Sequence, residues 1–342
     1  MFKTEEFEIW NLTPGQTIII GSQSLFNIVG RVKDPINTID FLYRLNQGKE
    51  VSIIYNISNR NAGRLERFGD FNIDTISVCD LKETNELQLR VERQGFSREW
   101  RIIFRVRQVA GERPQFSLDL TGISEPQEIG QTVDGFWQIG QEPTAPCLTI
   151  PPEEAGYDRV FLFGSEQWTS GYQIKARLEA TALIHRVYLL GLLFKWGSHT
   201  KGDGYSLPMN WSTGLGIFDS RSNTLRIRYG IDVHKENGRK IGDNLLGEAP
   251  LRQISPLSKS YQNLFGRKTD KDQFELNKPY WFHLVVHPKI HSLAVWQDGF
   301  PPPGQPQVVV NNPAELLPSG SVGVIAYNCG IRVHNFEVSP YG

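Results

Sequence analysis

The amino-acid sequence predicts an all-β protein made of two successive β-sandwiches. Short runs rich in Val, Ile, Phe and Tyr alternate with polar residues, and helical periodicity is nearly absent. The 32 glycines and 20 prolines interrupt these runs at short intervals, as turns between short strands require. A length of 342 residues favours two domains at about 150 residues each.

Composition excludes several classes of protein. The chain has 36 basic and 37 acidic residues, a net charge of −1, and therefore lacks the basic excess of a nucleic-acid binder. A hydrophobic content of 39% is too high for a disordered chain. No apolar run reaches the roughly 18 to 20 residues of a membrane span. The acidic start MFKTEEFEIW does not have the pattern of a signal peptide, so we expect a cytoplasmic protein, or an extracellular one if a leader has been removed.

Residues 1–108 are predicted to form the first sandwich. In the run from Glu99 to Val106 one side is apolar and the other mostly basic, which indicates a half-buried antiparallel strand. About seven short strands separated by turn signals every 8 to 12 residues or so are typical of an immunoglobulin-like fold. The predicted strands include Thr17–Ile20, Phe26–Val32, Asp40–Leu45, Val51–Tyr55, Glu86–Arg93 and Glu99–Val106.

Residues 109–125 are interpreted as a linker and first strand, and residues 126–342 as a larger two-sheet sandwich. The stretch 245–274 is long for a loop and contains Pro250 and Pro256, so we expect an insertion that carries a short helix, with its role left open. The predicted strands of this region are Gly135–Ile139, Val160–Gly164, Gly171–Glu179, Tyr188–Trp196, Gly214–Asp219, Thr224–Tyr229, Tyr280–His287, Ser292–Gln297, Gly320–Tyr327 and Ile331–Val338.

Cysteines and histidines give no metal pattern. Cys79, Cys147 and Cys329 are far apart without a CxxC pair, so we expect buried thiols and neither a zinc ribbon nor a disulfide framework. The histidines show no HExxH spacing. We therefore predict no cofactor. Calcium stays open as an alternative, with Asp203, Asp219 and Asp298 as its oxygen ligands.

The closing segment SGSVGVIAYNCGIRVHNFEVSP resembles the final hairpin of concanavalin A-like jelly rolls, in particular laminin-G-type lectin domains and 3-keto-disaccharide hydrolase-type domains. PYWFHLVVHPKIHSLAVWQDG, GYDRVFLFGSEQWTSGYQIKARL and GLLFKWGSH are similar to earlier strands of that superfamily. FNIVGRVKDP, IDFLYRLNQGKEVSI and RFGDFNIDTISVCDLKETNELQLRV resemble immunoglobulin-like modules of bacterial extracellular proteins. The superfamily includes lectins, glycoside hydrolases and polysaccharide lyases, so the resemblance implies glycan chemistry without selecting one activity.

Period-two alternation predicts one basic sheet face. If the strands of the larger region share a sheet, its outward side collects cationic residues, with Trp211 or Trp281 available to stack on a sugar ring. Arg presents a planar fork that matches a carboxylate or sulfate. We therefore expect a carbohydrate-recognition protein that binds an anionic glycan, against the alternative of an ordinary solvated face. The predicted ligand-binding residues are Lys175, Arg177, Lys195, Arg226, Arg228, Trp211 and Trp281.

An enzyme on the same scaffold is the main alternative, as a glycan hydrolase, a lyase or a biosynthetic cyclase. The Glu-x-Asp-x-x-Glu signature of family-16 glycanases and the motifs of alginate lyases are both missing. If there is catalysis, the acid–base candidates are His199, His283, Glu179 and Tyr229 in the same cleft. A third alternative is an adhesive module without a small ligand. Oligomeric state is not predicted.

Overall fold

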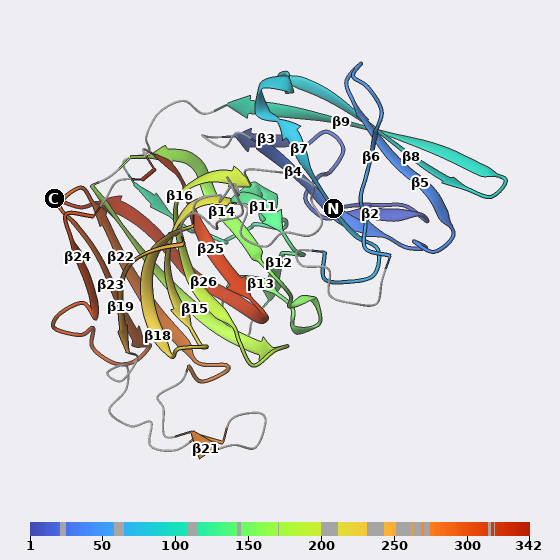
Figure 1. Cartoon of the computed structure of the whole chain (residues 1–342). Coiled ribbons are helices and arrows are strands. Elements are labelled where there is room, and N and C mark those ends of the chain that lie inside the picture. The colour runs from blue at the N-terminus through green and yellow to red at the C-terminus, as the bar shows by residue number, and fades with distance from the viewer. Residues whose placement is uncertain are drawn as a thin grey trace, which may run out of the picture.

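The computed structural model is all-β, with about 63% of the chain in strands and 3% in helix, as predicted. It describes residues 1–20, 25–57, 65–108, 115–141, 145–169, 171–199, 211–230, 243–250, 261–262, 268–269, 274–313, 316–317 and 319–342. No helix in this described part is long and apolar enough to cross a membrane. Figure 1 shows an N-terminal group of strands, in blue and cyan, beside a larger group that runs from green to red.

Two sheets build the N-terminal half around one apolar core. Its buried side chains include Phe7, Phe41, Phe71 and Phe104, all at most 1% exposed. The first sheet has the order β1 (Phe2–Lys3), β2 (Phe7–Ile9), β4 (Leu25–Val32) and β7 (Asp70–Ser77). The second has the order β3 (Thr17–Ile20), β9 (Phe96–Gln108), β8 (Thr84–Arg93), β5 (Thr38–Leu45) and β6 (Val51–Ser52).

Two larger sheets build the C-terminal half. The eight-stranded sheet has the order β12 (Gln138–Gln141), β13 (Pro146–Ile150), β26 (Cys329–Pro340), β15 (Tyr172–Leu183), β22 (Pro279–His287), β23 (Ile290–Gln297) and β24 (Val308–Asn311), with β10 (Phe116–Ser117) also paired to β26. The seven-stranded sheet has the order β11 (Gly130–Asp134), β14 (Arg159–Trp168), β25 (Gly320–Tyr327), β16 (Leu189–His199), β17 (Trp211–Asp219), β18 (Thr224–Gly230) and β19 (Asp243–Pro250).

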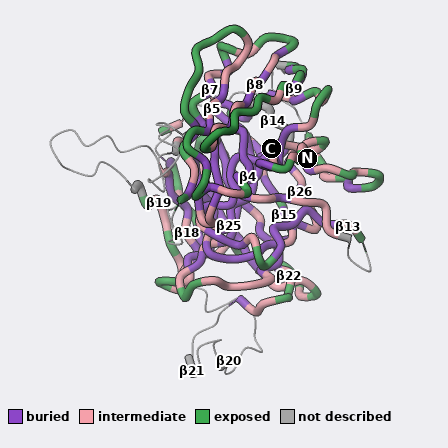
Figure 2. The backbone as a smooth tube through the Cα atoms, turned by 90° about the vertical axis from the view of Figure 1, so that its right-hand side faces the viewer, coloured by how far each residue is buried: buried purple, intermediate pink, exposed green. Residues whose placement is uncertain are grey.

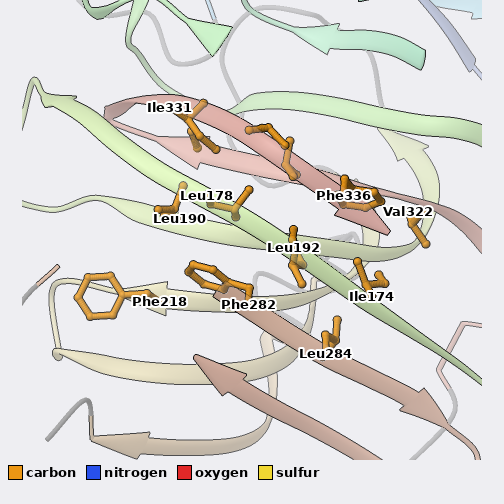
Figure 3. Packing of buried hydrophobic residues seen from close by; sticks show 14 of the residues in the cluster. Ile174, Leu178, Leu190, Leu192, Phe218, Phe282, Leu284, Val322, Ile331 and Phe336 are labelled. Carbon is orange, nitrogen blue, oxygen red and sulfur yellow. The ribbon is translucent and has the colours of Figure 1, made fainter. Parts of the chain in front are cut away.

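The main core lies between these two sheets, so this half is a β-sandwich. Along each strand every second side chain points inward, because successive residues of a strand face opposite sides. Figure 3 shows side chains of both sheets packed together, and Figure 2 shows the buried backbone concentrated inside the molecule. The labelled residues are Ile174, Leu178, Leu190, Leu192, Phe218, Phe282, Leu284, Val322, Ile331 and Phe336.

Strands that follow each other in sequence do not always share a sheet. β15 belongs to the eight-stranded sheet and β16 to the seven-stranded sheet. The last two strands separate in the same way: β25 pairs with β14 and β16, and β26 pairs with β13 and β15. This alternation between layers decides which predicted site residues can meet.

Buried polar groups join the two halves. The Asn72 side chain donates to the Val133 carbonyl oxygen at 3.0 Å and to Asp134 Oδ1 at 2.7 Å. The Asn11 side chain donates to the Thr132 carbonyl oxygen at 3.2 Å. Because buried polar groups need partners, these bonds fix β11 against the N-terminal half.

The same junction explains why β7 is not among the strands named from the sequence. Its Phe71 and Ile73 face the N-terminal core, whereas Asp70, Asn72 and Asp74 on the other side are at most 7% exposed. A strand buried on both sides loses the polar-out pattern that the sequence analysis relied on.

Three local expectations differ from the structure. The predicted strand Gly135–Ile139 is broken, since Gly135 has φ +85° and a Cβ there would lie 2.2 Å from the Arg159 side chain. The predicted insertion 245–274 begins as strand β19, and most of its remainder lies outside the described residues. Cys79 is exposed, although Cys147 and Cys329 are buried as expected.

The remaining elements are short. β20 (Tyr261–Gln262) pairs with β21 (Lys268–Thr269), and the 3₁₀ turns are η1 (Val78–Asp80), η2 (Pro126–Glu128) and η3 (Pro152–Glu154). The immunoglobulin-like assignment of the N-terminal half and the boundary at residues 109–125 stay predictions.

Candidate functional site

The predicted basic face is divided between two sheets. Lys175 and Arg177 lie on β15, and Trp281 and His283 lie on β22, in the eight-stranded sheet. The other predicted cations, Lys195, Arg226 and Arg228, lie on β16 and β18 of the seven-stranded sheet. The expectation that all of them share one sheet face is therefore wrong, because β15 and β16 diverge into different layers.

The cations of the seven-stranded sheet are poorly placed to meet a ligand. Lys195 is 0% exposed, and Arg228 is 6% exposed on the outer side of β18, where Leu215 and Ile217 of the neighbouring β17 are also fully buried. Arg226 is engaged by carboxylates: its Nη1 lies 2.7 Å from Asp219 Oδ2, and its Nε lies 3.2 Å from Glu248 Oε2.

Tyr229 points the other way, into the core. It is 0% exposed, and its hydroxyl lies 3.2 Å from Nε2 of the buried His291. It therefore cannot share a cleft with His283 and Glu179, as the enzyme alternative expected.

The eight-stranded sheet brings the other predicted residues together on its outer side, which we call the aromatic–cationic face. Their strand neighbours point into the core, so these side chains point outward. The cross-strand register sets Lys175 opposite His283, and Arg177 opposite Trp281. The face consists of Gln173, Lys175, Arg177, Trp281, His283, Trp296 and Asp298.

Trp281 is the centre of this face. Its ring lies nearly parallel to that of Trp296 on β23, with centroids 6.3 Å apart and an interplanar angle of 20°. Its indole N–H donates to Asp298 Oδ1 at 2.8 Å. Lys175 Nζ lies 4.7 Å from the ring centroid, which is a cation–π contact. Trp281 is therefore held in orientation by its neighbours.

Asp298 joins the aromatic and cationic parts of the face. Its Oδ2 accepts from Arg177 Nε at 2.9 Å and lies 2.7 Å from Arg177 Nη2, while Oδ1 holds Trp281. Two guanidinium nitrogens thus contact the same carboxylate oxygen, which holds Arg177 against Asp298. Arg177 is therefore already bound to a carboxylate.

His283 is kept neutral by its surroundings. Burial and the charge of Lys175 lower the pKa of His283 below its ordinary value of 6.5. Its Nε2 lies 2.8 Å from Gln173 Oε1, and the Gln173 amide donates to Ser339 Oγ at 3.1 Å. His283, Gln173 and Ser339 thus form a series of uncharged hydrogen-bonding groups near Trp281 and Trp296.

Glu179 lies further along β15 in a cluster of its own. Burial acts to raise the pKa of this carboxyl, but hydrogen bonds from His334 and Arg332 outweigh it and lower the pKa. His334 Nε2 and Arg332 Nη1 each lie 2.7 Å from a Glu179 oxygen. Glu179 is thus an ionised, fully engaged carboxylate.

Sequence reasoning missed Trp296 and the binding of Asp298 to this face. The segment PYWFHLVVHPKIHSLAVWQDG was identified as paired strands, and β22 and β23 confirm it. Counting outward from its turn would have set Trp296 opposite Trp281. His334 and Arg332 gave no such signal, because β26 pairs with β15 across more than 140 residues of sequence.

Some predictions fall outside the described part of the chain. These are Asp203 and the side chains of His199 and Trp211. The other calcium candidates, Asp219 and Asp298, bind Arg226 and Arg177. Among the described residues no group of three or more His, Cys, Asp or Glu side chains could hold a metal ion.

The solved structures compared here are distant from this chain in sequence. No protein-family model matches the chain, and no curated protein is similar to it. The exoplasmic/lumenal domain of VIP36, in its form bound to Ca²⁺ and Man₃GlcNAc, is 6% identical and aligns over 66% of this chain and 84% of its own, with a TM-score of 0.38. A GH43 protein from Bacillus licheniformis is 9% identical over 93% of this chain and 51% of its own, with a TM-score of 0.36.

A glycoside hydrolase family protein from Mycobacterium thermorestibile is 12% identical over 53% of this chain and 67% of its own, with a TM-score of 0.27. At TM-scores below 0.5 these likenesses carry no argument about this chain. Its architecture follows from its own strand order and core.

Proposed function

We propose that this protein recognises a glycan on the aromatic–cationic face of the eight-stranded sheet. The observation that carries the proposal is the partly exposed Trp281 ring, which lies nearly parallel to that of Trp296, 8% exposed, among hydrogen-bonding side chains on an outward face. One side of a sugar ring is lined by C–H groups, and an indole offers a large apolar surface for it. The hydroxyl groups at the ring edge then need the polar partners that Gln173 and His283 supply.

Lys175 has a defined part in this proposal. Its ammonium group covers the Trp281 ring and its side chain is exposed. An exposed cation–π contact is worth about 0.5–1 kcal/mol, so a stacking ligand can displace it at small cost. The displaced ammonium then donates to sugar hydroxyl groups, which keeps Lys175 a ligand-binding residue as predicted.

A neutral glycan fits the charges better than the anionic glycan expected from sequence. Arg177 is paired with Asp298, and Arg332 with Glu179, and among the described residues of β15 and β26 Lys175 and Glu337 lie at opposite positions. Electrostatic attraction of an anion needs an excess of positive charge, whereas these six side chains carry three positive and three negative charges. Uncharged His283 adds nothing to the cationic side.

Catalysis is the less supported function. A general acid needs a raised pKa, whereas the pKa of Glu179 is lowered. Glu179 and His283 are four residues apart in the strand register, which is about 13 Å at roughly 3.3 Å per residue. Two groups at that distance cannot share one bond-breaking step.

The proposal includes the finer fold assignment. In it, residues 126–342 form a concanavalin A-like jelly roll that carries the binding face, and residues 1–108 form an immunoglobulin-like module, with 109–125 between them. The support is the two-layer core of the larger half and the separate core of the N-terminal half.

A glycan array that contains both neutral and acidic sugars tests the proposed function. We expect neutral oligosaccharides to bind without turnover, and Trp281→Ala to weaken the best one at least tenfold. Trp281→Phe, which keeps a smaller ring, should have an affinity between those of the wild type and Trp281→Ala. Lys49→Ala, at an exposed site in the N-terminal half, should bind as wild type. Exclusive binding of acidic glycans would contradict the neutral assignment, and silence across the array would favour an adhesive module.

A further inference from the structure

A second aromatic group lies on the outer side of the eight-stranded sheet, away from the two indoles. The ring of Tyr341 meets that of His287 edge to face, with centroids 5.8 Å apart. Tyr341 follows β26 and is 36% exposed, and His287 ends β22. His287 alternates in step with Trp281, so both point outward. The two residues are six positions apart, which is about 20 Å at roughly 3.3 Å per residue.

Gly171 allows the rings of Tyr341 and His287 to meet. The Tyr341 backbone N–H donates to the Gly171 carbonyl oxygen at 2.7 Å, and the Gly171 N–H donates to the Val286 carbonyl oxygen at 2.8 Å. Gly171 therefore lies between the two segments that carry the rings. A Cβ at Gly171 would have no atom of the described residues within 4 Å apart from its chain neighbours, so the space beside the rings is open.

Hydrogen-bonding side chains separate this aromatic group from Trp281. We call His283, Gln173 and Ser339 the polar band, because the Gln173 side chain contacts both of the others. Gln173 and Ser339 are opposite each other on β15 and β26, so the band crosses the strands. Since Ser339 Oγ accepts from Gln173, its own hydroxyl hydrogen can donate to a ligand.

Tyr341 and His287 combine ring surfaces with polar groups. The backbone N–H of Lys289 donates to His287 Nδ1 at 3.2 Å. A neutral histidine whose Nδ1 accepts a hydrogen bond carries its proton on Nε2, which can then donate. The Tyr341 hydroxyl group can donate and accept. A sugar ring needs both kinds of contact, because its C–H side is apolar and its edge carries hydroxyl groups.

We propose that Tyr341 and His287 form a second sugar-binding subsite, and that the protein recognises a linear neutral oligosaccharide. This inference rests on the proposed function, because Trp281 is its first subsite. One sugar ring contacts Trp281, the next units form hydrogen bonds with the polar band, and a further ring contacts Tyr341. The second contact forms within a complex that is already bound, so it strengthens binding of a long chain. A disaccharide is too short to reach both ends.

Calorimetric titration of the full chain with oligosaccharides of two lengths tests this inference. The probes are the hexasaccharides and disaccharides of β-1,4-linked glucose, mannose and xylose. We expect at least one hexasaccharide to bind, and the disaccharide of the same sugar to bind at least tenfold more weakly. Tyr341→Ala should weaken the hexasaccharide about tenfold and leave the disaccharide unchanged, whereas Trp281→Ala should weaken both.

Tyr341→Phe keeps the ring and should retain most of the hexasaccharide affinity. Phe96→Ala, at an aromatic residue of the N-terminal half that is 37% exposed, is the matched control and should bind as wild type.

The second subsite alone is overturned if both lengths bind equally well, or if Tyr341→Ala binds the hexasaccharide as wild type while Trp281→Ala does not. If Trp281→Ala also binds as wild type, the proposed function is wrong as well. If no hexasaccharide binds, the inference is overturned, and the glycan array decides whether the proposed function falls with it.

Discussion

The outer faces of the two large sheets have opposite characters. On the seven-stranded sheet the outward side chains form a second buried apolar cluster, which includes Leu162, Leu193, Leu215 and Ile217, each 0% exposed. On the eight-stranded sheet the outward side carries charged, polar and aromatic side chains, of which Lys175 is exposed, beside apolar ones such as Val309. Both sheets turn an apolar face to the shared core. They differ in the side chains on the opposite, outward face.

This difference indicates which of the two sheets can bind a soluble ligand. A strand that is apolar on both sides, such as β17, stabilises the fold and offers no polar partners. A strand whose outward side is mainly polar, such as β15, leaves side chains that can contact a ligand. Of the cations that the sequence placed on one face, Lys195 and Arg228 are buried in the seven-stranded sheet, whereas Lys175 of the eight-stranded sheet is exposed.

The greatest loss of stability is expected when buried volume is removed from the outer side of the seven-stranded sheet. Leu215→Ala should lower the free energy of unfolding by about 2–5 kcal/mol, because it leaves a cavity in a fully buried cluster. Val309→Ala, at a residue of the eight-stranded sheet that is 47% exposed, should change it by less than about 0.5 kcal/mol. Urea unfolding followed by circular dichroism measures both, and equal costs would remove the contrast between the faces.

A smaller loss of stability is expected when the polar contacts between the two halves are removed. Asn72→Ala removes the donor to Val133 and Asp134 and the acceptor for Asn27, so it should cost about 1–3 kcal/mol. Asn37→Ala, whose side chain is exposed, is the control and should cost less than about 0.5 kcal/mol. Thermal unfolding of the two variants gives the comparison. A neutral Asn72→Ala would mean that these bonds do not hold β11 in place.

In the eight-stranded sheet, Glu179 should make a smaller contribution to stability, and that contribution depends on pH. The folded pKa of Glu179 is lowered, so the unfolded chain takes up its proton first as the solution is acidified. This contribution to stability is present above the ordinary glutamate value of 4.5 and is lost as the pH falls through the folded pKa. Glu179→Gln should therefore flatten the loss of stability in acid.

Glu337→Gln on the same sheet is the matched control for that measurement. Denaturant unfolding at a series of pH values from neutral to acidic compares both variants with the wild type. If Glu179→Gln kept the full acid dependence of the wild type, the pairing with Arg332 and His334 would contribute nothing in solution.

The smallest expected effect is that of Lys175→Ala. Removal of an exposed cation–π contact should change the free energy of unfolding by less than about 1 kcal/mol. It should still alter the tryptophan fluorescence, because a charge beside the Trp281 ring is lost. A large destabilisation would instead identify Lys175 as a structural residue like Lys195.

Local alternation predicted many of the strands and, on β15 and β22, the side that faces the core. Lys175 and Arg177 were predicted on the outward side of their strand, and their neighbours Ile174 and Ala176 do lie in the core, since that property depends only on period two. The hairpin of β22 and β23 was also predictable from its turn.

The division into sheets was not predictable from the same signals. Lys195 was grouped with Lys175 because β15 and β16 are consecutive, whereas the structure inserts β26 beside β15 and β25 beside β16. Such long-range pairings depend on the packing of the whole core and leave no mark in a local pattern. The cluster of Glu179, Arg332 and His334 depends on the same long-range pairing.

The indole N–H signals of the tryptophans in a ¹⁵N-correlated NMR spectrum test the glycan-binding face most directly. A neutral glycan found on the array should shift the signals of Trp281 and Trp296, which lie on the aromatic–cationic face. The signal of Trp196, 1% exposed behind the seven-stranded sheet, should stay where it is. Shifts at Trp196 with none at Trp281 would contradict the account.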